Sequence, residues 1–153
     1  MAQIKRSIFI NAPVEQVFDY ATNPDNQPSW ARDVNEVKER SPGPVTVGTT
    51  WIQVVTGFFM AQQALGKVTE YERPHRYAQE LAYGRRSSTT IFEFEPQGNG
   101  TKLTMIAPST PPSGLAAFLS RLFGGGLVGG LLEHDLKGLK KVLEQAARPS
   151  ITA

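Results

Sequence analysis

Apolar and polar residues alternate with a period of two through much of the N-terminal two thirds of the chain. Ile4, Ile8 and Ile10 share one face of such a pattern, which predicts a first strand with one buried face. Six later segments are rich in β-branched and aromatic residues and are bounded by turn-forming residues: 34–40, 49–56, 60–71, 77–83, 87–95 and 101–107. One of the separators, Gly98-Asn99-Gly100, has the composition of a tight turn. The pattern therefore predicts about seven strands with mainly hairpin connections.

Two short helices are expected directly after the first strand. Pro13 stands where a helix can begin, because its missing N–H would be unpaired there in any case. Four apolar residues then fall on one helical face: Val14, Val17, Phe18 and Ala21. Asn23-Pro24 repeats the start signal as an amide cap followed by proline. Trp30 marks the expected end of this second helix, about two turns later.

From residue 113 onward the apolar period becomes helical. One stripe is formed by Leu115, Phe118, Leu119, Leu122 and Phe123. A second stripe is formed by Val128, Leu132, Leu136, Leu139 and Leu143. Spacings of three and four residues place each stripe on one face of a helix. The chain is therefore expected to end in a long amphipathic helix.

Five glycines between residues 124 and 130 interrupt the helical pattern. Each glycine in a helix interior costs about 1 kcal/mol relative to alanine, so the segment should kink or break the helix. Two interpretations stay open. The glycines form a flexible gate or leave room for a ligand, or they form a plain loop between two helices.

The order of these elements predicts an α+β fold. A strand is followed by two short helices, six further strands and one long helix, so the strands do not alternate with helices as in a parallel sheet. A large antiparallel sheet with one apolar face must bury that face, and the terminal helix is the main element that covers it. We expect one domain over residues 1–147 and a short tail at 148–153.

Composition and charge exclude several classes of protein. The 153 residues include no cysteine, which excludes disulfides, thiolate metal sites and a cysteine nucleophile. A net charge of +2 is too small and too evenly spread to favour nucleic-acid binding. No segment approaches the roughly 18 consecutive apolar residues of a membrane span, and no apolar leader follows the first basic residues. We expect a cytoplasmic protein without an integral membrane span.

Catalytic and metal-binding motifs are missing from the sequence. The two histidines, His75 in a turn and His134 on the last helix, are expected at the surface. No His-Glu-x-x-His pattern occurs, and the glycine-rich segment lacks the Lys-Ser/Thr pair of a phosphate-binding loop. The sequence therefore predicts no metal, no cofactor and no catalytic residue.

Alternation along the strands identifies candidates for the lining of an internal cavity. The candidates from the strands are Trp51, Tyr77, Gln79, Leu81, Phe92, Phe94, Leu103 and Met105. The candidates from the helix are Leu115, Phe118, Leu119 and Leu122. Ala64, Gly66 and Val68 are small and would widen the space above their strand. A mostly apolar lining suits a lipid-like or aromatic ligand, while the alternative is that these side chains simply fill a core.

Phe58 and Phe59 are adjacent at an expected hairpin, so both cannot point inward on one strand. One of them is a candidate portal, membrane-touching tip or subunit contact, and a homodimer is possible. Packing against a neighbouring helix is the alternative.

The sequence resembles the START/Bet v 1-like superfamily, specifically its polyketide cyclase/dehydrase and lipid-transport branch. The resemblance is carried in order by IFINAPVEQVFDY at 8–20, the NP to W segment at 23–30, VGT at 47–49, VTEYERPHR at 68–76 and LKGLKKVLE at 136–144. It implies a helix-grip fold, in which a curved antiparallel sheet wraps round the long C-terminal helix and leaves a hydrophobic tunnel. Members of the superfamily include sterol and lipid carriers, plant hormone receptors and aromatase/cyclases.

Three functions are compatible with this picture. The first is binding or transport of a hydrophobic small molecule, favoured by the aromatic, carboxylate-poor lining. The second is a cyclase or dehydratase, which needs an inward acid or base such as Glu70 or Arg86, with Tyr77, Gln79 and Tyr83 to orient the substrate. The third is an interaction module with a vestigial cavity beside a large apolar surface patch.

Overall fold

The computed structural model describes residues 3–31, 34–57, 60–108 and 127–147. Its elements are, in order, β1 (Gln3–Ile10), α1 (Val14–Ala21), the 3-10 helix η1 (Pro24–Asn26), α2 (Gln27–Trp30), β2 (Val34–Lys38), β3 (Thr50–Gly57), β4 (Met60–Glu72), β5 (Arg76–Tyr83), β6 (Arg86–Gln97), β7 (Gly100–Pro108) and α4 (Leu127–Ala147). The predicted order of strand, short helices, strand series and terminal helix is confirmed. The stripe expected over residues 115–123 lies outside the described residues.

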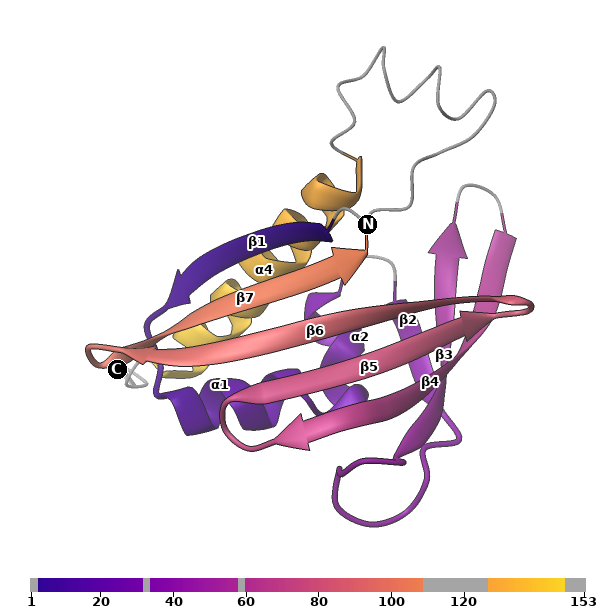
Figure 1. Cartoon of the computed structure of the whole chain (residues 1–153), viewed down its shortest axis with the longest axis horizontal. Helices are drawn as coiled ribbons and strands as arrows, with labels where there is room; N and C mark the ends of the chain where they lie inside the picture. The colour runs from indigo at the N-terminus through magenta and orange to yellow at the C-terminus, as the bar shows by residue number, and fades with distance from the viewer. Residues whose placement is uncertain (1–2, 32–33, 58–59, 109–126, 148–153) are drawn as a thin grey trace, which may run out of the picture.

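The strands form one antiparallel sheet with the order β1-β7-β6-β5-β4-β3-β2. Successive strands from β2 to β7 are neighbours, and β1 pairs with β7 at the far edge. Figure 1 shows the sheet curving strongly, with β3 and β4 turned away from the direction of β6 and β7. The helices α1, α2 and α4 lie together on one side of it. This is the helix-grip arrangement expected from the sequence.

The hairpin between β6 and β7 illustrates how local sequence sets the register. Gln97 pairs with Gly100, which leaves Gly98 and Asn99 as a two-residue loop. Gly98 has φ +59°, the left-handed value that the first loop position of a type II′ turn requires. The predicted turn at this place is confirmed.

The helix α4 buries the leucine stripe that the sequence predicted. Leu132, Leu136, Leu139 and Leu143 are each at most 7% exposed. Contacts of α4 are mainly with β1 and α2. The approach to α2 is close, because a Cβ built on Gly138 would lie 2.6 Å from the carbonyl oxygen of Trp30. The helix is therefore held against one end of the sheet and against α2.

Aromatic rings join α1 to the sheet. Phe18 is fully buried and meets Phe94 edge-on at 4.9 Å between ring centroids and Tyr71 at 5.2 Å. Edge-to-face pairs of this kind contribute about 0.5–1.5 kcal/mol beyond the area they bury. The apolar face predicted for α1 is thus part of the core.

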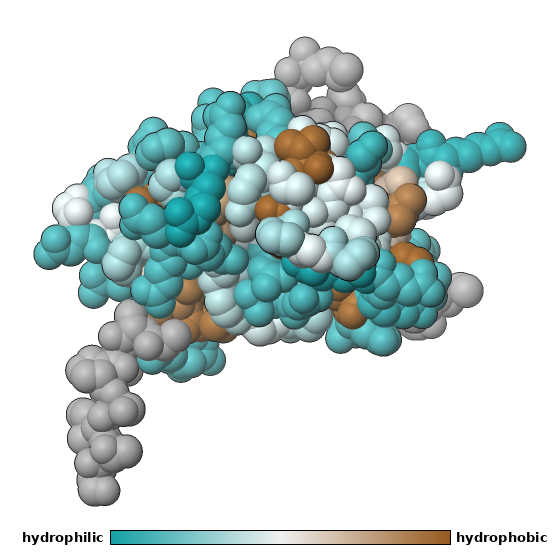
Figure 2. All heavy atoms as spheres, turned by 90° about the horizontal axis from the view of Figure 1, so that it is seen from below, coloured by the Kyte–Doolittle hydropathy of each residue, from teal (hydrophilic) through white to brown (hydrophobic). Residues whose placement is uncertain are grey.

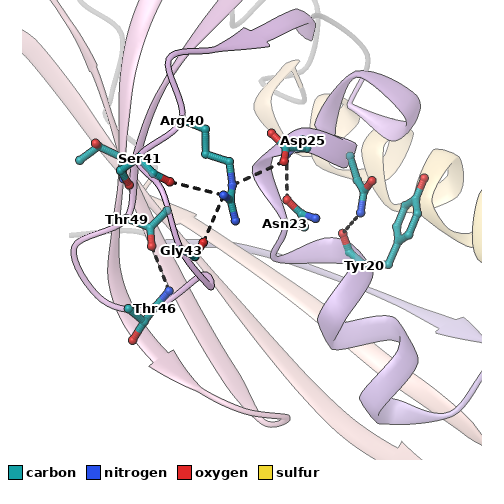
Figure 3. Close-up of polar contacts among 10 residues, drawn as sticks. Tyr20, Asn23, Asp25, Arg40, Ser41, Gly43, Thr46 and Thr49 are labelled. Atoms are coloured by element: carbon teal, nitrogen blue, oxygen red, sulfur yellow. Dashed lines mark hydrogen bonds and ion pairs between the residues drawn. The ribbon is translucent and has the colours of Figure 1, made fainter.

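The loop between β2 and β3 is fastened to η1 by Arg40. Its guanidinium forms an ion pair with Asp25 at 3.5 Å and donates hydrogen bonds to the carbonyl oxygens of Ser41 and Gly43 (Figure 3). Asn23 caps η1, since its Oδ1 accepts a hydrogen bond of 3.1 Å from the Asp25 N–H. The amide cap predicted at this position is confirmed.

A bidentate ion pair joins α1 to the corner between β4 and β5. Arg73 donates to both carboxylate oxygens of Asp19, at 2.7 and 2.8 Å. These hydrogen bonds hold the pKa of Asp19 below its usual value of 3.8. Because the pKa is lower in the folded state, the pair contributes stability above the unfolded pKa and loses it as the pH falls through the folded pKa.

The Arg73→Gln variant is expected to raise the pKa of Asp19 towards its ordinary value. Titration of the Asp19 side-chain carbonyl resonance by NMR measures this. The change in overall stability should be small, because both side chains are about half exposed. A carboxyl pKa that is the same in both proteins would contradict the role given to Arg73.

Exposed apolar side chains are scattered rather than gathered. Figure 2 shows one face that is mostly hydrophilic or neutral, with apolar residues in small separate groups. Among the described residues, the large apolar side chains that are exposed are Phe9, Val47 and Leu65, which lie in β1, the β2–β3 loop and β4. The described part of the chain therefore offers no support for the interaction-module hypothesis, which needs a large apolar patch.

Candidate functional site

A cavity of about 180 Å³ lies between the concave face of the sheet and the helices α2 and α4. It is lined by Gln27, Trp30, Ala31, Val34, Gln53, Val55, Gln79, Leu81, Tyr83, Thr90, Phe92, Met105, Leu132 and Asp135. This volume is far more than one water occupies and is comparable with the roughly 150 Å³ of a protein cavity that binds benzene. The sheet and the helices thus meet without filling the space between them.

The proposed cavity-lining residues that lie in the described part of the chain divide into two groups. Gln79, Leu81, Phe92 and Met105 line the cavity. Trp51, Tyr77, Phe94 and Leu103 are each at most 1% exposed and belong to the surrounding core instead. Leu115, Phe118, Leu119 and Leu122, the proposed portal residues Phe58 and Phe59, and the glycines at 124–126 lie outside the described residues.

The expected wide spot above β4 is filled by a tryptophan. Trp51 pairs with Gly66 across β3 and β4, and its indole lies where a Gly66 side chain would stand. A Cβ built on Gly66 would be only 2.2 Å from Cε2 of the Trp51 ring. The small residue therefore makes room for a neighbouring side chain rather than for a ligand.

Several lining residues were missed by the sequence analysis. Gln53 and Val55 could have been predicted from the sequence, because they follow Trp51 at period two on the inward face of β3. Asp135 follows Leu132 by three residues on α4, a spacing that favours the same helical face. Gln27 and Trp30 carry no such signal, since the direction in which a one-turn helix faces depends on tertiary packing.

Three glutamines make one side of the cavity polar, and we call Gln27, Gln53 and Gln79 the glutamine face. All three are buried, with 3%, 2% and 7% of their surface exposed, respectively. The Oε1 atom of Gln79 accepts hydrogen bonds from the Tyr77 hydroxyl at 3.0 Å and from Nε2 of Gln27 at 3.2 Å. The Oε1 atom of Gln53 accepts one from the Trp51 indole at 3.2 Å. The cavity is therefore less apolar than its sequence suggested.

The Tyr77 hydroxyl is a permanent donor in this network. Its ring is fully enclosed, and burial raises the pKa of the phenol far above its usual value of 10.0. The group consequently stays protonated and keeps donating to Gln79 at any physiological pH.

The Trp30 indole is an unusual part of the same wall. Its Nε1 is fully enclosed and has no hydrogen-bond partner among the described residues. The ring stands edge-on to Phe92, with 6.3 Å between centroids and 84° between planes. An unpaired buried donor costs about 1–3 kcal/mol, so the position of this residue is set by packing with Phe92 and α4.

The acid and base groups considered from sequence lie elsewhere. Glu70 pairs with Arg76 at 2.6 Å in a partly exposed cluster that also holds Glu93. Arg86, His75 and His134 are exposed. None of these residues lines the cavity, whereas Asp135 does. Within the described ranges no group of three or more His, Asp or Glu side chains could hold a metal ion, and no helix is long and apolar enough to cross a membrane.

Solved structures share this architecture over nearly the whole chain. A Thermus thermophilus crystal structure matches with a TM-score of 0.76 and 19% identity, covering 96% of this chain and 100% of that one. A START superfamily protein from Mycobacterium smegmatis matches with a TM-score of 0.73 and 16% identity, covering 95% of this chain and 99% of that one. The crystal structure of Ara h 8.0201 matches with a TM-score of 0.65 and 11% identity, covering 94% of this chain and 98% of that one. At such identities the likeness establishes the fold, which is that of the START/Bet v 1-like superfamily.

The family is shown by sequence. The profile described as polyketide cyclase / dehydrase and lipid transport matches residues 1–144. The chain belongs to this family. A comparison with curated protein sequences found no match.

Proposed function

We propose that the protein binds and carries a small, largely hydrophobic molecule in the cavity between the sheet and α4. The observation that carries the proposal is the unfilled space of about 180 Å³ beside apolar side chains such as Phe92, Met105 and Leu132. Family membership supports it, because the family description covers lipid transport as well as cyclases and dehydrases. Burial of apolar ligand surface against these side chains supplies the binding energy, about 25 cal/mol per Å².

Catalysis of the cyclase or dehydratase type is the second candidate. One observation favours it, namely that Asp135 brings a carboxyl group to the cavity wall. A general acid or base must lie within hydrogen-bond reach of the reacting group, and among the described residues Asp135 is the carboxyl group that lines the cavity. Binding of a substrate remains the first step in both candidates.

Native mass spectrometry with a panel of lipids, polyketide-like compounds and small aromatics tests both candidates. A carrier is expected to retain a compound in a 1:1 complex and to release it unchanged. A dehydratase instead releases a product lighter by one water, and a cyclase that eliminates no water releases an isomer that chromatography separates from the substrate. Val55→Trp should strongly reduce retention, because Val55 lines the cavity.

Val54→Trp is the matched control for this experiment. Val54 is the adjacent residue of β3 and points to the opposite face of the sheet, so its substitution should leave retention intact. The proposal is contradicted if no compound is retained, or if Val55→Trp retains ligands as well as the unmodified protein does.

A further inference from the structure

The carboxamide of Gln53 has an orientation that its neighbour imposes. An indole N–H can only donate a hydrogen bond, so the 3.2 Å contact with Trp51 identifies the Gln53 oxygen as the acceptor. The NH₂ group of the same carboxamide must then point away from Trp51. This residue is 2% exposed and lines the cavity.

Gln79 is oriented in the same sense by two donors. Its oxygen accepts hydrogen bonds from both the Tyr77 hydroxyl and the Gln27 carboxamide. The NH₂ group of Gln79 must therefore point away from these two donors. Among the described residues, neither Nε2 of Gln53 nor Nε2 of Gln79 has a hydrogen-bond partner.

These two nitrogens border open space rather than packed atoms. The fully enclosed side-chain polar atoms without a hydrogen-bond partner in the described part of the chain are Nε1 of Trp30 and Nε of Arg40, and neither glutamine nitrogen is among them. Since both glutamines line the cavity, that open space is the cavity itself. The glutamine face thus offers N–H donors from β3 and from β5 to a guest.

We propose, on the basis of the function proposed above, that the ligand is an uncharged molecule of about one ring that carries a carbonyl-type oxygen, bound by the Nε2 donors of Gln53 and Gln79. An oxygen acceptor satisfies donors that a pure hydrocarbon would leave unpaired. The cavity volume of about 180 Å³ suits a single ring better than a sterol or a long acyl chain.

The charge of the walls selects against anionic ligands, and the glutamine donors select against cationic ones. No Lys, Arg or His lines the cavity within the described residues, and its one ionisable carboxyl group belongs to Asp135. A carboxylate ligand would lose its hydration without gaining a cation. A protonated amine would bring no acceptor for the glutamine donors. A neutral ketone, aldehyde, ester or amide meets both conditions.

Three probes of similar size separate these possibilities: acetophenone, α-methylstyrene and benzoate. The first two differ in the exchange of C=O for C=CH₂, and the third adds a negative charge. Titrations followed by ¹H–¹⁵N NMR are expected to move the side-chain NH₂ resonances of Gln53 and Gln79 downfield with acetophenone but not with α-methylstyrene. Benzoate should bind at least about tenfold more weakly than acetophenone, since burial of its charge is uncompensated.

Substitution of the donors provides the second readout. Gln53→Met and Gln79→Met should each lower the ratio of acetophenone affinity to α-methylstyrene affinity by about fivefold, the value of one neutral hydrogen bond. Gln63→Met is the matched control, because Gln63 is an exposed glutamine of β4, and its substitution should leave the ratio unchanged. The ratio cancels any general effect of a substitution on the fold.

Failure of this inference is distinguishable from failure of the proposed function. Equal NH₂ shifts with the first two probes together with an unchanged affinity ratio, or tight binding of benzoate, would overturn the inference and leave a binding cavity in place. Binding of long-chain lipids but of none of the three probes would also overturn it alone. The absence of binding by every compound in both experiments would overturn the two together.

Discussion

Phe92→Ala is expected to lower the free energy of unfolding by roughly 3–5 kcal/mol, the usual cost of removing a buried aromatic ring. Phe92 is 1% exposed and lies at the centre of an aromatic cluster. Its ring meets Tyr77 edge-on at 5.4 Å and Trp30 at 6.3 Å, and stacks with Phe94 at 6.4 Å. Urea denaturation followed by circular dichroism measures the loss.

The same substitution should also change the size of ligand that the protein accepts. Phe92 is part of the cavity wall, so its removal enlarges the space available to a guest. A two-ring ketone such as 2-acetonaphthone should gain affinity relative to acetophenone in the variant. Ile91→Ala is the matched control, because Ile91 is half-buried on the opposite face of β6 and should leave this preference unchanged. An unaltered size preference in Phe92→Ala would contradict the cavity assignment.

Gly66→Ala is the second substitution for which a large effect is expected. The new methyl group would stand 2.2 Å from the Trp51 ring, which is fully buried and cannot move without disturbing the core. Overpacking of this kind costs about 1–3 kcal/mol and occasionally more. Displacement of the indole would also break its hydrogen bond to Gln53, so the glutamine face should lose its order.

Gly130→Ala is the control for the effect at Gly66. A Cβ at Gly130 meets nothing within 4 Å, and the residue is exposed in α4. Alanine there should be neutral or stabilising by up to about 1 kcal/mol, because it favours the helix. Thermal denaturation of both variants gives the comparison. A Gly66→Ala protein as stable as the unmodified one would show that Trp51 does not depend on the missing side chain.

The strands were predictable because period-two alternation reports which face of a sheet is buried. That signal placed β3 to β7 within a few residues of their observed bounds. It failed at the end of β2, which stops at Lys38 rather than at residue 40, since Glu39 adopts a left-handed φ of +53°. Such a conformation is set by the loop that follows and by the hydrogen bonds of Arg40, which no local pattern reveals.

The cavity was only partly predictable for a different physical reason. Alternation tells which face a side chain occupies but not how deep it lies, so Trp51 and Gln53 carry the same signal and have different environments. The indole turns across Gly66 into the core, while the carboxamide stays at the cavity. Whether a residue fills space or borders it depends on neighbours distant in sequence, such as Gln27 from α2.

The most direct test of the open space between sheet and helix is the set of intermolecular NOEs between the isotope-labelled protein and the tightest-binding compound of the mass spectrometry screen. We predict contacts from ligand protons to Phe92 and Met105, which are paired on the neighbouring strands β6 and β7, and to Leu132 of α4, all three of which line the cavity. Contacts confined to exposed apolar side chains such as Leu65 and Val47, with none to these three at saturation, would contradict it.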